Sequence, residues 1–128
     1  MVVITRTALD FIRHAAAHTD PEEFIALLRK NRKGEIHEIL VIPQSDYGRG
    51  FSSINTWSYS YTINHCGTVH SHPNGNNLPS RADLRFFRTM GEAHLIIGYP
   101  YRDQDVRAFD QEGREIGLKI AEVKKRRG

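Results

Sequence analysis

The fold of this chain is decided by residues 67–83, which read GTVHSHPNGNNLPSRAD. The first six residues predict a strand, and Pro73 ends it because proline cannot donate a hydrogen bond to a neighbouring strand. The residues that follow, 74–79, are rich in Gly, Asn and Pro and predict a loop. Ser80 then predicts the N-terminus of a helix. The stretch therefore predicts a strand, a loop and a helix in immediate succession.

Three side chains of this stretch form the ligand set of a catalytic metal site. His70 and His72 lie two residues apart on the predicted strand, so they share a face about 6.6 Å apart and can converge on one ion. Asp83 lies in the first turn of the predicted helix, where the positive helix end favours a carboxylate. Two neutral imidazoles, one carboxylate and a water make a zinc set with one open position. Ser71, between the histidines, points to the other face of the strand.

Each part of this motif also has a structural interpretation. Ser80 and Asp83 form a Ser-x-x-acid cap, which is common at helix N-termini without any metal, and His-x-His occurs by chance in exposed strands. The conjunction of the two, in this order and joined by a Gly- and Pro-containing loop, favours a bound metal.

Other candidate ligands lack a partner at a suitable spacing. Cys66 shares strand parity with His70 but lies about 13 Å away along the strand, so we interpret it as a small buried side chain. His94 heads an apolar strand, which is typical of a hydrogen-bonded core histidine or of a residue that supports a ligand. The histidines without such a partner are His14, His18, His37 and His65.

Outward from this stretch, the patterns predict a single domain over residues 1–128. Apolar residues at helical spacing after Thr7 and Asp10, which resemble a capping pair, predict a helix over 7–18. A second helix is expected from Ser80 to Gly91. Strands are predicted over 24–28 and 35–42 as a hairpin, and over 67–72, 94–99, 106–109 and 116–123. Residues 51–62 also have the composition of a strand, but the pattern is ambiguous from Trp57 to Asn64. Two helices and about six strands in this order predict a mixed α/β domain with a largely antiparallel, curved sheet.

Composition sets the class of protein and its compartment. The chain has 128 residues, of which 39% are apolar and 26% charged, as in soluble globular domains. A domain of this size buries roughly two-thirds of its unfolded surface, so a metal is not needed for folding. One cysteine excludes an internal disulfide. No targeting or membrane-spanning pattern is visible, so we expect a cytoplasmic protein.

The net charge of +3 and the pI of about 9.2 raise the alternative of a nucleic-acid-binding domain. Five of the 18 basic residues lie in residues 119–128, which we interpret as a solvated, frayed tail. Basic and acidic residues nearly balance in the rest of the chain. Nucleic acid is therefore not expected as the main partner.

The motif resembles the signature of a known family. His-Ser-His-Pro followed by Ser-x-x-Asp, with seven residues between the second His and the Ser, is similar to the motif of the JAMM (MPN+) metalloproteases, which are deubiquitinase-like enzymes. The flanking residues 67–69, 86–87 and 94–100 are typical of the short archaeal members. That family also has a glutamate upstream, and Glu23, directly before Phe24, matches its position. The resemblance covers nearly the whole chain and implies the MPN/JAMM, cytidine-deaminase-like architecture.

The resemblance implies a role for each site residue. His70, His72 and Asp83 would bind one Zn²⁺ per chain, Glu23 would be the general base and then the general acid, and Ser80 would donate a hydrogen bond to the oxyanion. Without the resemblance, Glu23 has the pattern of a solvated acid in a turn. Its neighbour Glu22 is the competing candidate.

The resemblance also implies a substrate class. The enzyme would be a zinc-dependent isopeptidase or peptidase that cuts after the C-terminal diglycine of a ubiquitin-like modifier or a sulfur-carrier protein. A diglycine tail can lie extended along a sheet edge in a tunnel that excludes larger residues. Residues 44–64 are where an insertion can contact this partner. The sequence does not decide between a monomer and a homodimer. The alternative within the family is a non-catalytic MPN scaffold module, whose members lack the His-x-His and the Asp.

Overall fold

The computed structural model describes residues 1–43 and 64–123. Along these residues the chain forms β1 (Val2–Thr5), α1 (Arg6–Thr19), β2 (Ile25–Lys30), β3 (Ile36–Val41), β4 (Gly67–His72), α3 (Arg81–Phe87), β5 (Ala93–Gly98), the 3-10 helix η3 (Asp103–Asp105), β6 (Val106–Phe109), β7 (Glu115–Ile116) and β8 (Leu118–Ala121). The strand expected over 51–62 lies outside the described residues. None of the described helices is long and apolar enough to span a membrane.

The described strands form one mixed sheet in the order β7-β6-β5-β4-β2-β3-β1-β8. Neighbours are antiparallel in the pairs β2–β3, β2–β4, β5–β6 and β6–β7. They are parallel in the pairs β1–β3, β1–β8 and β4–β5. The predicted mixed α/β class is confirmed, as are the β2–β3 hairpin and the strand β4. With β2 on one side and β5 on the other, β4 lies at the centre of the sheet.

The sheet curls so far that its two edges come together. β7 and β8 are the edge strands on opposite sides of the sheet, yet Gly117 alone separates them in the chain. The N–H of Val2 in β1 donates to the carbonyl of Gly117 at 2.8 Å, so the junction is tied to the strand beside β8. A strand is found within the predicted range 116–123, as β8, but its bounds were wrong, because Ile116 belongs to β7 and the chain changes edges at Gly117.

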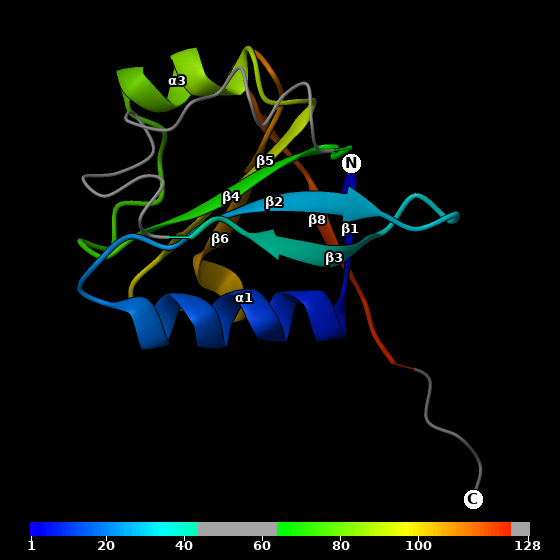
Figure 1. Ribbon diagram of the computed structural model, residues 1–128, viewed down its shortest axis with the longest axis horizontal. Helices are drawn as coiled ribbons and strands as arrows, with labels where there is room; N and C mark the ends of the chain where they lie inside the picture. Colours follow the sequence, from blue (N-terminus) through cyan, green and yellow to red (C-terminus); the bar gives the residue numbers. More distant parts are fainter. Residues whose placement is uncertain (44–63, 124–128) are drawn as a thin grey trace, which may run out of the picture.

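The two helices cover opposite faces of the sheet (Figure 1). The face under α1 holds the larger apolar cluster, in which Leu9 and Ile12 pack with residues such as Val69 and Leu95. The face under α3 holds a second cluster, made of Ile25, Leu27, Ile42, Phe86, Phe87, Met90, Ile96 and Phe109. Side chains alternate along a strand, so Val69 and Ser71 of β4 face the α1 side and His70 faces the α3 side.

The start of α1 differs from the prediction. Thr5 is the N-cap, and its hydroxyl accepts a hydrogen bond from the N–H of Ala8 at 3.2 Å. The capping pair expected at Thr7 and Asp10 is wrong, because the unpredicted strand β1 runs straight into the helix. β1 is only four residues long, which is too short for its alternation of buried and half-buried side chains to stand out.

The end of α3 also differs from the prediction. The helix ends at Phe87 and not at Gly91. Gly91 has φ +103°, and a Cβ at this position would lie 2.6 Å from the carbonyl oxygen of Cys66. Only glycine suits this backbone conformation and this close approach, so Gly91 turns the chain from α3 into β5.

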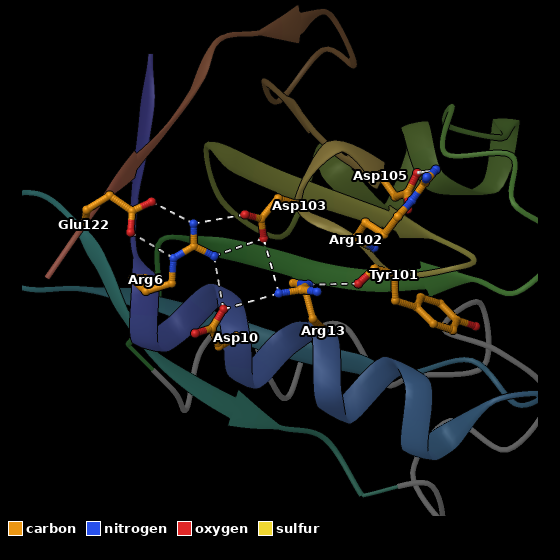
Figure 2. A network of polar contacts seen from close by, with 8 residues as sticks. All are labelled: Arg6, Asp10, Arg13, Tyr101, Arg102, Asp103, Asp105 and Glu122. Atoms are coloured by element: carbon orange, nitrogen blue, oxygen red, sulfur yellow. Dashed lines mark hydrogen bonds and ion pairs between the residues drawn. The ribbon is translucent and has the colours of Figure 1, made fainter.

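A polar network fastens the start of α1 to distant segments (Figure 2). The guanidinium of Arg6 forms ion pairs with Glu122 at 2.7 Å, with Asp103 at 2.9 Å and with Asp10 at 3.1 Å. Because Glu122 follows β8, this network holds the C-terminal segment against α1. The prediction of a frayed tail from residue 119 is wrong for residues 119–121, because they belong to β8 and pair with β1.

Candidate metal centre

The three predicted ligands come together at the C-terminal end of β4. Nε2 of His70 lies 3.0 Å from Nε2 of His72 and 3.2 Å from Oδ1 of Asp83. Nε2 of His72 lies 3.4 Å from Oδ2 of Asp83. Among the described residues, these three form the cluster of metal-type donors. The strand supplies the histidines on one face, and the first turn of α3 brings the carboxylate to them.

These donors are close enough together to bind one cation. One ligand atom from each of the three residues lies within 4.8 Å of the other two. The two carboxylate oxygens of Asp83 each face a different histidine, and two imidazoles with one carboxylate are a ligand set of catalytic zinc. Oδ1 of Asp83 is also buried and accepts no hydrogen bond from the described residues. A buried carboxylate against imidazoles needs a compensating positive charge, so the residues present fit a metal ion.

The orientation of His72 is set by a backbone carbonyl. Nδ1 of His72 contacts the carbonyl oxygen of Asn76, which can only accept a hydrogen bond, so Nδ1 carries a proton and donates it. This tautomer leaves the lone pair of Nε2 directed at the other donors, as in histidines that bind metals. Burial lowers the pKa of His72, but the hydrogen bond with Asp83, the Asn76 carbonyl and the charges of Asp83 and Glu23 outweigh it and leave that pKa raised.

Asp83 belongs to the metal cluster and to the helix cap at once. The hydroxyl of Ser80 accepts a hydrogen bond from the N–H of Asp83 at 3.1 Å, and the N–H of Ser80 donates to Oδ2 of Asp83 at 2.8 Å. This is the complete capping box that the sequence predicted. Burial alone raises the pKa of Asp83, but contacts with His70 and His72 and the backbone of Ser80 prevail and hold that pKa far below its usual range. The carboxylate is therefore charged.

Glu23 lies beside this cluster, on the same side of the sheet. Ile25 of β2 pairs with His70 of β4 in antiparallel register, and continuing that register by two residues brings Glu23 next to His72. Opposed residues of an antiparallel pair share a face, so this register directs Glu23 to the ligand face. The charge of Glu23 contributes to the raised pKa of His72, which supports this placement. Glu22 is exposed, in the turn after α1.

His94 lies in the core, as one of the two sequence interpretations proposed. Its Nε2 lies 2.9 Å from the carbonyl oxygen of Gly91 and must donate to it, so Nδ1 accepts from the hydroxyl of Thr68 at 2.7 Å. Its ring stacks on Phe87 with 4.2 Å between centroids. Burial lowers the pKa of His94 to about 4, so the ring is neutral. Cys66 is half-buried away from the cluster, and burial raises the pKa of its thiol.

One contributor to the centre had no signal in the sequence. The carbonyl of Asn76 orients His72 through its backbone, and any residue type offers a backbone carbonyl. The loop was predicted from its composition, but which of its carbonyls faces the histidine depends on how the loop folds back. A three-dimensional structure is needed to find such a contact.

A curved mixed sheet with a His-x-His strand end and an Asp at a helix N-terminus defines a metallohydrolase domain. Residues 5–111 match the family of prokaryotic homologs of the JAB domain. The chain is 35% identical over 132 residues to a probable metalloprotease of Haloferax volcanii, and the match covers 96% of this chain and 81% of the relative. This chain belongs to the JAMM/MPN+ family of metalloproteases.

Two solved structures share this fold. The first is described as JAMM, a metalloprotease-like zinc site in the proteasome and signalosome; it has a TM-score of 0.75 and 30% identity and covers 94% of this chain and 98% of its own. The second is a JAB1/MPN domain protein from Archaeoglobus fulgidus, with a TM-score of 0.73 and 31% identity over the same shares of the two chains. The predicted architecture is thereby confirmed.

Proposed function

We propose that this protein is a zinc-dependent isopeptidase or peptidase that hydrolyses the bond after the C-terminal diglycine of a ubiquitin-like modifier or a sulfur-carrier protein. The observation that carries the proposal is the convergence of two imidazole nitrogens and a buried carboxylate within reach of one cation. A non-catalytic scaffold has no use for such a cluster. The diglycine substrate is inferred from the family, and a tail without side chains would suit binding in an extended conformation beside a strand.

Each residue of the site has a distinct task in this proposal. His70, His72 and Asp83 would hold the zinc, which supplies Lewis-acid polarisation and lowers the pKa of water toward ~7. Glu23 would take the proton of the attacking water and return it to the leaving amine. Ser80 would donate its hydroxyl proton to the oxyanion. The helix cap uses only an acceptor lone pair of that hydroxyl, so its proton is available for this second task.

The proposal is tested with purified protein and a diglycine-linked conjugate of a small ubiquitin-like modifier. We expect about one zinc per chain by elemental analysis and cleavage after the diglycine, with release of the free modifier by mass spectrometry. The matched control is the same conjugate with Ala-Ala in place of the diglycine, which we expect to stay intact. Zinc-supplemented protein without zinc would overturn the metal assignment. Equal cleavage of both conjugates would overturn the diglycine assignment alone.

A further inference from the structure

The loop over residues 20–24, which carries Glu23, is fixed at both of its ends. Neither of the side chains that fix it belongs to the metal cluster. Phe24 at one end is bonded to Ser71 of β4, and Asp20 at the other end is bonded to Tyr101, which follows β5.

The contact with Ser71 lies where the chain leaves the sheet. The hydroxyl of Ser71 accepts a hydrogen bond from the N–H of Phe24 at 2.7 Å, and the N–H of Ser71 donates to the carbonyl of Phe24 at 2.9 Å. In a regular antiparallel ladder, a pair in this register exchanges two backbone hydrogen bonds. Here the hydroxyl makes one of the two, so it sets the course of the backbone one residue after Glu23. Ser71 is fully buried, at 0% exposure, so water cannot replace its hydroxyl.

The contact with Tyr101 fixes the other end of the loop. The phenol of Tyr101 donates to Oδ2 of Asp20. Tyr101 itself is held by the carbonyl of Gly98, which accepts from its N–H at 2.9 Å. The guanidinium of Arg13 on α1 donates to the carbonyl of Tyr101 at 2.9 Å (Figure 2). The backbone of Tyr101 is thus anchored on both β5 and α1.

The contacts with Ser71 and Tyr101 both attach the loop to the strand pair at the metal cluster. β4 and β5 are paired in parallel, with Ser71 opposite Ile97 and His72 opposite Gly98. Ser71 lies between the two histidines, and Tyr101 lies three residues after the partner of His72. A displacement of the cluster and a displacement of the loop are therefore coupled through the same strand pair.

We propose that Ser71 and Tyr101 are positioning residues, which hold Glu23 at the correct distance from the metal cluster. The inference rests on the proposed function, in which Glu23 is the general base. A misplacement of about 1 Å can cost two orders of magnitude in rate, so a base on a loop needs such anchors. Neither residue belongs to the metal cluster, because Ser71 faces the α1 side of the sheet and the phenol of Tyr101 donates to Asp20.

The test compares Ser71→Ala with Thr68→Val. Both variants delete a buried hydroxyl of β4, but the hydroxyl of Thr68 serves His94 and not the loop. We expect Ser71→Ala to lower kcat roughly 10- to 100-fold, by misplacement of the base, with KM and zinc content unchanged. Thr68→Val should lose stability without a change at the loop, so it is compared with Ser71→Ala by hydrogen exchange at Phe24 and not by kcat. Hydrogen exchange gives a readout independent of activity, because the Phe24 amide should lose protection in Ser71→Ala and keep it in Thr68→Val.

A double-mutant cycle with Glu23→Gln shows whether Ser71 acts through Glu23. Once the base is absent, Ser71→Ala should change the remaining rate less than about twofold, because the effects of coupled residues do not add. Tyr101→Phe keeps its ring in place and gives a second, milder variant, for which we expect a fall in kcat of about threefold or more. Tyr101→Phe also tests the positioning role if Ser71→Ala does not fold.

The outcomes separate this inference from the proposed function. Full kcat in Ser71→Ala and Tyr101→Phe, with Glu23→Gln inactive, would overturn the positioning role and leave the general base in place. An equal loss from Ser71→Ala with and without Glu23 would also overturn it. If Glu23→Gln kept its kcat, the general base assignment would fall, and the positioning role would fall with it.

Discussion

At the scale of single residues, the site depends on side chains that do two things at once. Asp83 points Oδ1 at His70 while Oδ2 accepts the N–H of Ser80, so the same carboxylate closes the metal cluster and caps α3. Ser80 offers a lone pair to the cap and keeps a proton to donate. Glu23 takes no part in the helix cap formed by Ser80 and Asp83. A substitution at Glu23 should therefore change activity alone, whereas a substitution at Ser80 should change both activity and stability.

Glu23 can be distinguished from its neighbour by paired substitutions. Glu23→Gln should retain zinc, fold normally and lose at least about 10² in kcat, as expected for removal of a general acid–base group. Glu22→Gln is the matched control and should stay close to wild type, because Glu22 is exposed in the turn after α1. Steady-state kinetics and elemental analysis check both. The reverse result would mean that the register of residues 22–25 against β4 is shifted by one.

Substitutions of Ser80 separate the cap from the oxyanion. If Ser80 is only a cap, Ser80→Ala should cost about 1 kcal/mol of stability and leave the kcat of the folded enzyme intact. If it also holds the oxyanion, kcat should fall by roughly 10² or more, and this is the result we expect. Ser80→Asp keeps a capping acceptor but brings a negative charge to the oxyanion, so it should fold and be inactive. An active Ser80→Asp enzyme would leave Ser80 as a cap alone.

At the scale of elements, β4, β5 and α3 are joined by one buried histidine. His94 of β5 accepts from Thr68 of β4, donates to Gly91 after α3 and stacks on Phe87 of α3. These contacts hold the helix that carries Asp83 against the strand that carries His70 and His72. These contacts bury the ring, and burial requires it to be neutral because it disfavours the charged form.

This requirement predicts a loss of stability in acid. The pKa of His94 is lowered from 6.5 to about 4 in the folded protein, so the unfolded chain binds a proton first as the pH falls. Stability from this group is present above pH 6.5 and declines as the pH falls toward 4, by about 2 kcal/mol between pH 7 and 5. Urea unfolding of zinc-loaded wild type and His94→Gln at both pH values checks this. The wild type should lose more stability than the variant, and equal losses would contradict the assignment.

The elements also show what the sequence could predict. β4, the hairpin and the start of α3 were predictable, because local patterns of alternation, turn residues and capping specify them. His70, His72 and Asp83 lie within one such local motif. β1 and the change of edge at Gly117 were not predictable, because they depend on pairing between opposite ends of the chain. Glu23 was assigned from a family resemblance, and its place beside His72 depends on the register of β2 against β4.

At the scale of the whole molecule, the core is made up of two apolar clusters, and the metal ligands are not among their members. One cluster fills the α1 face and the other the α3 face, and the edges of the sheet close through Gly117 and the Arg6 network. None of these contacts needs an ion. The protein should therefore fold without zinc, unlike small domains whose folding depends on a structural metal.

Chelation tests this separation of folding from chemistry. Removal of zinc should abolish cleavage, while the far-ultraviolet circular dichroism spectrum barely changes and thermal unfolding stays cooperative. The melting temperature should fall, because zinc binds only the folded form, and added zinc should restore it. Glu23→Gln is the matched control: since Glu23 is not a ligand, its melting temperature should fall by as much as that of wild type. Unfolding on chelation would instead mark a structural site, and a smaller fall in Glu23→Gln would make Glu23 a ligand.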